Sequence, residues 1–360
     1  MFVRWWHIVL VFVVAPVAVI LAAWIGFFNV GASTGHWKIT EWFLHFAMQS
    51  AVRTYALPVD VPTELPREGV QLAAAHFATG CAVCHGAPGE PRSPVVKRML
   101  PQPPDLATVV GEWSDAELFR IVKHGVRFTG MPAWPTQDRD DEIWSMVAFL
   151  RELPSLEPQK YWELAYGSNS LPSSQYRSFE RALADCARCH ETNGAGRSAL
   201  TPIIAGQSEA YLLESLRAYA EGRRVSGIMA QATAGVDPDD LAGVARYFAD
   251  QPPTILENSQ TSQAESIGRE IAERGLPAKG VPACLGCHGD KAQNPAYPKL
   301  WGQRADYIEG QLRLFRLGKR NGTAYSHLML NAAKNLTDED IEAAAAYFTR
   351  GKIPPTDQAD

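Results

Sequence analysis

Six cysteines fall into three copies of one pattern, Cys-x-x-Cys followed at once by histidine. The copies are Cys81, Cys84 and His85; Cys186, Cys189 and His190; and Cys284, Cys287 and His288. Thiol pairs with this spacing serve three chemistries: a zinc site, a redox dithiol or the covalent attachment of haem c. No cysteine lies outside the three copies, so the pattern differs from the disulfide framework of a short, loop-rich chain.

The adjacent histidine favours haem c. Two thiols one helical turn apart can each add to a vinyl group of the porphyrin, and the histidine that follows can then bind the iron. A zinc site commonly combines two thiol pairs, or a pair with two distant histidines, whereas each pair here stands alone, roughly a hundred residues from the next. A thioredoxin-like dithiol needs a βαβ context, and no convincing strand pattern is present. We therefore expect three covalently bound haem c groups, with His85, His190 and His288 as iron ligands.

The sixth iron ligand follows from aligning the three repeats. Each repeat ends in an acidic start and an apolar helical pattern, and a methionine stands twelve residues before the first apolar position of that helix. These methionines are Met131, Met229 and Met329. A thioether opposite a histidine is a common ligand pair of electron-transfer cytochromes and raises their reduction potential.

Histidines near two of these methionines are the alternative ligands. His124 precedes Met131 in the first repeat, and His327 precedes Met329 in the third. The remaining methionines Met48, Met99 and Met146 are interpreted as apolar filler, the usual role of a lone methionine.

The surroundings of the motifs repeat as well and predict an all-α fold. "PIIAGQSEAYLLESLRAYAEGRR" from Pro202 aligns without gaps with "PKLWGQRADYIEGQLRLFRLGKR" from Pro298. A helical pattern precedes each motif, so each unit is predicted to run helix, motif, loop, helix, methionine loop, helix. The third unit carries an added "LPAKGVPA" before its first cysteine.

Composition and proline-rich stretches divide the chain into segments. The predicted segments are a transmembrane anchor (1–30), an amphipathic helix and tether (31–66), a first haem domain (67–155), a linker (156–175), a second haem domain (176–252), a linker (253–263), a third haem domain (264–353) and a tail (354–360).

The anchor is predicted from the nearly uncharged run "HIVLVFVVAPVAVILAAWIGFF". A cleaved signal peptide is the alternative, but the run exceeds the usual apolar core of such peptides. Arg4 on the short side suggests that the bulk of the chain lies outside, so we expect a single-pass protein of the bacterial inner membrane with its haem domains on the periplasmic side. The aromatic helix that follows, "HWKITEWFLHFAMQSAVRTYAL", is predicted to lie at the membrane interface or to dock on a partner subunit.

The pattern resembles the class I cytochrome c family over residues 67–353. The first unit is similar to a single-haem domain of that class, and the second and third resemble tandem two-haem cytochromes in their shared "GQ" and "GxR" features. The resemblance implies one small all-helical domain per haem, with Pro202 and Pro298 near the ligand histidines. It also implies that Arg224 and Arg320 pair with haem propionates, although solvated helix ends are the other interpretation. The first unit lacks the "GQ" and "GxR" features, which puts a shared docking geometry for that unit in doubt.

These observations predict an electron carrier without catalytic residues of its own. The leading hypothesis is a membrane-anchored triheme cytochrome that relays single electrons in a respiratory chain, towards a haem-copper terminal oxidase. The alternative is a cytochrome c subunit of a membrane dehydrogenase complex, accepting electrons from a flavin or quinone-cofactor enzyme. A haem peroxidase or a haem sensor is disfavoured, because either needs an open position at the iron and the three aligned methionines would occupy it. The expected partners are thus the lipid bilayer and a redox protein, and the net charge of -5 gives no sign of nucleic-acid binding.

Overall fold

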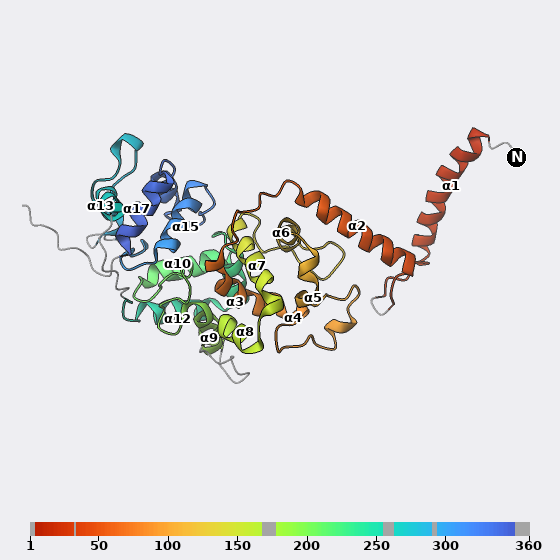
Figure 1. Ribbon diagram of the computed structural model, residues 1–360, viewed down its shortest axis with the longest axis horizontal. Coiled ribbons are helices and arrows are strands. Elements are labelled where there is room, and N and C mark those ends of the chain that lie inside the picture. Colours follow the sequence, from red (N-terminus) through yellow and green to blue (C-terminus); the bar gives the residue numbers. More distant parts are fainter. Residues whose placement is uncertain (1–3, 32–33, 168–177, 255–262, 290–293, 350–360) are drawn as a thin grey trace, which may run out of the picture.

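The computed structural model describes residues 4–31, 34–167, 178–254, 263–289 and 294–349. These residues form helices and loops without a strand, and only two isolated bridges occur among them, Ala87–Glu90 and Leu276–Val281. The all-α prediction is therefore confirmed for the described part of the chain. Three helical units follow one another in chain order, with the second between the first and the third (Figure 1).

The first unit surrounds the largest apolar core. Its helices are η1 (Arg67–Gly69), α3 (Val70–Gly80), α4 (Ala82–His85), η2 (Val96–Arg98), α5 (Leu106–Val109), η3 (Val110–Glu112), α6 (Asp115–His124), α7 (Asp140–Glu152), η4 (Leu153–Ser155) and α8 (Pro158–Tyr166). α3 packs against α7 and α8, and Phe77, Phe149 and Tyr161 are fully buried where they meet.

The second and third units are built on the same plan. The second contains α9 (Ser178–His190), α10 (Glu209–Ala220), α11 (Gly227–Thr233) and α12 (Pro238–Ala249). The third contains α13 (Gln263–Arg274), η5 (Pro277–Lys279), α14 (Leu285–His288), α15 (Ala305–Arg316), α16 (Ser326–Ala333) and α17 (Asp338–Phe348). The added segment of the third unit forms η5 inside a small loop closed by the Leu276–Val281 bridge.

The acidic helix starts act as N-terminal caps. Thr337 and Asp340 form a reciprocal capping box at α17, and the Asp237 side chain accepts a hydrogen bond from the backbone of Asp239 at α12. Such caps satisfy backbone N–H groups that have no partner within the helix. The predicted helices with an acidic start are thus present as α7, α12 and α17, and the second and third of them carry a side-chain cap.

The first and last helices of a unit cross at close range. In the third unit, a Cβ atom on Gly268 of α13 would lie 2.0 Å from the carbonyl oxygen of Ala343 in α17. In the first, a Cβ atom on Gly69 would lie 2.1 Å from the Oγ atom of Ser145 in α7. A larger side chain at either position would meet the facing helix, so glycine permits these close crossings.

The predicted linker 156–175 begins with a helix that belongs to the first core. α8 starts at Pro158, whose missing N–H costs nothing in the first turn of a helix. Tyr161 and Ala165 of α8 are completely buried against the first core. The remainder of the predicted linker, from residue 168 on, lies outside the described residues.

The N-terminal region differs from the prediction. The apolar run forms α1 (Trp5–Trp24), which contains Pro16. Across the described ranges, however, no helix combines the length and the apolar character that crossing a bilayer requires. The predicted transmembrane anchor, and with it the location as a single-pass protein of the bacterial inner membrane with periplasmic haem domains, is therefore wrong.

The predicted amphipathic helix forms α2 (Lys38–Ala56) and packs on the protein itself. Its C-terminal half lies against α6, where Arg120 stacks over the ring of Tyr55 and Arg53 approaches Glu117 at 3.8 Å. Ala56 is buried in this contact. Part of α2 thus belongs to the first unit, a contact that the sequence did not predict.

In the interface between the second and third units, a glutamine of each unit forms hydrogen bonds with the backbone of the other. Gln303 accepts a hydrogen bond from the backbone N–H of Ile203 and donates one to its carbonyl, both at 2.9 Å. Gln207 does the same to Lys299, at 2.9 and 2.7 Å. The aligned "GQ" feature of the two repeats therefore makes a two-fold-related contact.

The first and second units are joined differently, by an arginine inside the second motif. Arg188, between Cys186 and Cys189, is buried and donates a 2.6 Å hydrogen bond to the carbonyl of Ala75 in α3. Its guanidinium also stacks over the ring of Tyr166, 4.8 Å from the centroid. The second motif is thereby tied to the helix that leads into the first motif.

A buried histidine beside this arginine makes the first unit sensitive to acid. Burial, and then the nearby charge of Arg188, lower the pKa of His76 from 6.5 to about 4. As the pH falls below 6.5, this histidine therefore becomes protonated in the unfolded chain while it stays neutral in the folded chain. We expect the free energy of unfolding to fall by about 3 kcal/mol by pH 4.

Substituting His76→Gln should remove much of this pH dependence, because glutamine does not titrate. Chemical denaturation of both proteins between pH 7 and 4 measures the difference, with His45→Gln on the exposed face of α2 as the control. Parallel pH profiles for His76→Gln and the unmodified protein would contradict this prediction.

Candidate functional site

The three motif histidines are held in one tautomer by one type of hydrogen bond. The Nδ1 atom of His85 lies 2.9 Å from the carbonyl oxygen of Pro104, that of His190 3.2 Å from Pro202, and that of His288 2.8 Å from Pro298. A carbonyl can only accept, so Nδ1 carries the proton and donates. The Nε2 atom of each ring is then left with its lone pair, as a metal ligand requires.

Burial keeps these imidazoles neutral. It lowers the pKa of His190 to about 4 and lowers the pKa of His85 and His288 as well, with the proline carbonyls opposing the shift. Neutral imidazole is the form that binds a metal. The prolines that the resemblance implied, Pro202 and Pro298, are thus confirmed beside their histidines.

Burial also keeps the first cysteine of each motif protonated. It raises the pKa of Cys81 and Cys186 to about 12 and that of Cys284 to about 11. All six thiols are free in this structure. A redox dithiol or a zinc site works through thiolates, which these surroundings disfavour, whereas a thioether carries no charge and suits an apolar site.

One cavity of about 790 Å³ joins the second and third motifs. All the side chains predicted to hold haem in these two units line it: Cys186, Cys189, His190, Met229, Cys284, Cys287, His288 and Met329. Each unit contributes its two cysteines, its histidine and its methionine, a donor set that suits a covalently attached haem with two axial ligands. The residues present therefore fit haem c.

The methionines and their rival histidines occupy different places. Met229 in α11 and Met329 in α16 line the cavity, whereas His327 is exposed and does not line it. In the first unit, His124 is exposed at the end of α6, and Met131 is held in a turn by a 3.1 Å hydrogen bond from its N–H to Thr129. That Met131 is the ligand opposite His85 stays a prediction.

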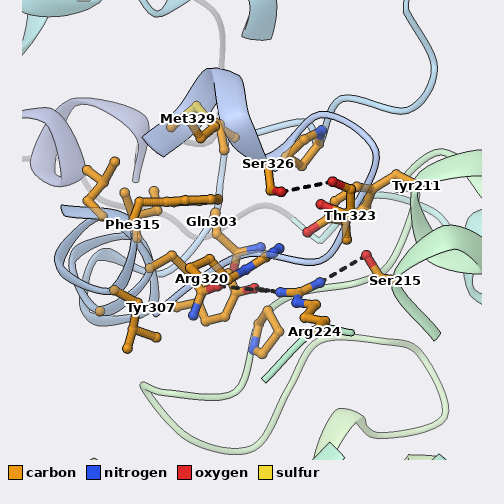
Figure 2. A pocket seen from close by; sticks show the side chains of 18 of the residues that line it. Tyr211, Ser215, Arg224, Gln303, Tyr307, Phe315, Arg320, Thr323, Ser326 and Met329 are labelled. Carbon is orange, nitrogen blue, oxygen red and sulfur yellow. Dashed lines mark hydrogen bonds between the residues drawn. The ribbon is translucent and has the colours of Figure 1, made fainter. Parts of the chain in front are cut away.

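Two arginines in the cavity are buried without a carboxylate partner in the described part of the chain. Arg224 donates to Ser215 at 2.9 Å, and Arg320 donates to Gln311 at 2.9 Å. Figure 2 shows the two guanidinium groups side by side, next to Tyr307. Arg224 is 3 % and Arg320 6 % exposed, so the interpretation of these residues as solvated helix ends is wrong.

Two buried cations that face each other need negative charge nearby. The positive charge of Arg224 adds to burial in lowering the pKa of Arg320, which shows that the two groups repel. The Nε atom of Arg224 and one Nη atom of Arg320 are also buried without a hydrogen-bond partner. A buried, unpaired charge is costly, so the two guanidinium groups favour a bound anionic group in this cavity.

Sequence reasoning missed Pro104 because its spacing differs. It lies nineteen residues after His85, whereas Pro202 lies twelve after His190 and Pro298 ten after His288. The proline-rich run "LPQPPDL" was the only signal available. No signal in the sequence predicted the contact that Arg188 makes between the first and second units.

Comparison with known proteins gives one family match and several relatives. The family profile described as cytochrome C oxidase, cbb3-type, subunit III matches residues 68–150. A thiosulfate dehydrogenase electron acceptor of Thiomonas intermedia is 33% identical over 180 residues, covering 49% of this chain and 82% of the relative. Cytochrome c4 of Pseudomonas aeruginosa is 33% identical over 190 residues, covering 51% of this chain and 90% of the relative.

Among solved structures, cytochrome c4 of Acidithiobacillus ferrooxidans is 32% identical and aligns with a TM-score of 0.42. That alignment covers 46% of this chain and 98% of the solved one.

The arginine pair makes a prediction about reduction potential. Replacing Arg224 with glutamine in the haem-loaded protein should lower the potential of a neighbouring haem by roughly 60 mV, a tenfold change for a one-electron couple. The reason is that a nearby cation disfavours the oxidised haem, which carries one positive charge more than the reduced form. A spectroelectrochemical titration measures the shift, with Arg217→Gln on the exposed face of α10 as the control. Equal shifts in the two variants would count against the assignment.

Proposed function

Because the chain belongs to the cytochrome c family, we propose that it is an electron carrier with three covalently bound haem c groups, one at each motif. Membership of this family supports a role in electron transfer and the binding of haem c. Three haems are inferred from this chain's own residues, since each of its three motifs has the same cysteine spacing and a histidine held through Nδ1.

The repeated histidine hydrogen bond is the observation that carries this proposal. A proline carbonyl fixes Nδ1 as the donor in every unit, so each ring presents a neutral Nε2 to one side. The first unit shares this feature although its sequence diverges from the other two. Three sites prepared in the same way support three bound haems in three domains, at 67–155, 176–252 and 264–353.

In each unit we assign the two cysteines to the thioether bonds and the histidine to one axial position. Met131, Met229 and Met329 would supply the second iron ligand in their units, and Arg224 and Arg320 would pair with haem propionates. Haem c, when bound, supplies a reversible one-electron couple, and these residues set its potential and exclude water. Two protein ligands at each iron leave no open position, so the chain acts as a carrier and not as an enzyme.

The redox partners are inferred from the comparisons. The profile of a cbb3-type oxidase subunit matches the first unit, which favours a haem-copper terminal oxidase as the acceptor in a respiratory chain. A relative is named as the electron acceptor of thiosulfate dehydrogenase, which favours a dehydrogenase as the donor. The second candidate function is therefore that of a cytochrome c subunit or dedicated acceptor of a dehydrogenase.

Haem stoichiometry tests the proposal directly. Replacing both cysteines of one motif with serine should remove about one third of the covalently bound haem, because each motif would attach one group. A pyridine haemochrome assay together with the intact mass of the purified protein measures this for each motif in turn. A purified protein with two haems, or a motif whose loss leaves the haem content unchanged, would overturn the triheme assignment.

Electron exchange with purified enzymes separates the two candidate roles. We expect the reduced protein to be oxidised by a cbb3-type oxidase, and the oxidised protein to be reduced by a dehydrogenase in the presence of that enzyme's substrate. Stopped-flow absorbance at the haem α-band follows both reactions, and an unrelated single-haem cytochrome c serves as the generic protein for comparison, reduced as the donor to the oxidase and oxidised as the acceptor from the dehydrogenase. If neither reaction is faster than with this generic protein, both assignments fail.

A further inference from the structure

A carboxylate of the first unit lies at the start of the helix that carries Met229 in the second. Glu142, in the first turn of α7, is 4 % exposed. One of its oxygens accepts a 2.6 Å hydrogen bond from the hydroxyl of Ser226, and the other accepts a 2.7 Å hydrogen bond from the N–H of Gly227. These partners are the N-cap and the first residue of α11.

The serine passes this contact on to the methionine. The Oγ atom of Ser226 donates to Glu142 and at the same time accepts a 3.2 Å hydrogen bond from the backbone N–H of Met229. The carboxylate is thus two hydrogen bonds away from the backbone of Met229. Because the hydroxyl proton points to Glu142, its lone pairs are directed towards the helix.

Apolar packing also holds the first turn of α11 against the first unit. Ile228, which directly precedes Met229, is buried within the core cluster of the first unit. The indole of Trp134 lies so close to Gly227 that a Cβ atom there would be 2.1 Å from Nε1, and this Nε1 donates to Glu142 at 3.2 Å. Trp134 itself follows Met131 by three residues, so the two methionine segments meet at this tryptophan.

The charge of Glu142 is compensated locally. The Nη1 atom of Arg139 lies 3.0 Å from the carboxylate and also donates to the carbonyl of Val225 at 3.1 Å. Arg139 therefore bridges Glu142 and the segment before α11. A buried carboxylate held by one guanidinium and several N–H and O–H donors has a defined geometry, because each lost bond would leave a buried polar group unsatisfied.

Among the described residues, the equivalent acids of the other units make no such contact with a neighbouring unit. Asp340 binds the N–H of Thr337 and the amine of Lys279, both in the third unit. Asp240 is half-buried at the start of α12. All three acids fit the pattern of an acidic helix start, but Glu142 is the one that caps a helix of another unit.

We propose that Glu142 is a positioning residue for Met229, so that axial ligation in the second unit depends on the docking of the first. This inference rests on the proposed function, in which Met229 is an iron ligand. The first unit holds Ser226, Gly227 and Ile228 in place, and the position of Met229 follows from them. Loss of the contact should therefore change one haem site of the three while the other two stay as they are.

The test uses the full-length, haem-loaded protein and five variants. Glu142→Ala removes the carboxylate and Glu142→Gln keeps its shape. Ser226→Ala keeps the carboxylate and removes the hydroxyl that links it to the backbone of Met229. Asp240→Asn is the matched control at the equivalent acid of the second unit. Met229→Leu identifies which spectroscopic signals belong to that ligand. Proton NMR of the reduced protein reports each ligated methionine by its own shifted methyl signal, and imidazole binding reports how often a ligand position opens.

We expect Glu142→Ala and Ser226→Ala to weaken the Met229 signal alone and to raise the apparent affinity for imidazole at that site about tenfold, since this affinity scales with the open fraction. Glu142→Gln should retain most of the signal, and Asp240→Asn should match the unmodified protein. Haem content and helical circular dichroism control for folding, and Ser226→Ala decides the matter if Glu142→Ala does not fold.

Unchanged Met229 signals and imidazole affinities in both Glu142→Ala and Ser226→Ala would overturn the inference, as would equal weakening of all three methionine signals. Failure of the proposed function gives a different result. In that case Met229→Leu would itself remove no shifted methyl signal, because Met229 would not be a ligand in the unmodified protein.

Discussion

Each site in this protein depends on a hydrogen bond from a histidine Nδ1 to a proline carbonyl. A covalent thioether fixes where a porphyrin is attached, but it does not fix the direction in which the neighbouring imidazole points. The carbonyl settles both the tautomer and the ring orientation, and burial prevents the ring from becoming charged. The loop that follows each motif brings a proline carbonyl to this point.

The two interfaces between units have different physical characters. The second and third units meet through matched residues of the repeat, with Gln207 opposite Lys299, Gln303 opposite Ile203, and the two arginines facing each other. The first and second units meet through contacts that do not follow the repeat, made by Arg188 on one side and by Glu142 with Trp134 on the other. The second unit therefore contacts both of its neighbours, the third unit through repeated residues and the first unit through contacts of its own.

Much of the fold could be predicted because it depends on local patterns. The motif spacing, the acidic helix starts and the gap-free alignment from Pro202 and Pro298 each require only a few neighbouring residues. The features that could not be predicted depend on contacts between residues far apart in the sequence. α8 has the composition of a linker, and only its burial against α3 makes it part of a core. Glu142 has the same local pattern as Asp240 and Asp340, and nothing in the sequence states which of the three reaches another unit. The prediction of a membrane anchor was wrong for a different reason. It took the apolar run as a helix that spans the bilayer, and the described residues contain no such helix.

The exchange of glutamines has a consequence for how such a molecule could arise. In a two-fold contact, residue i of one copy touches residue j of the other while residue j of the first touches residue i of the second, so one sequence change acts at two places at once. An interface with this symmetry is the one that a single unit would form with an identical copy of itself. Joining two such copies through one chain raises their effective concentration without requiring any new contact. The second and third units therefore have the geometry of a fused homodimer, to which the first unit was added by contacts of another kind.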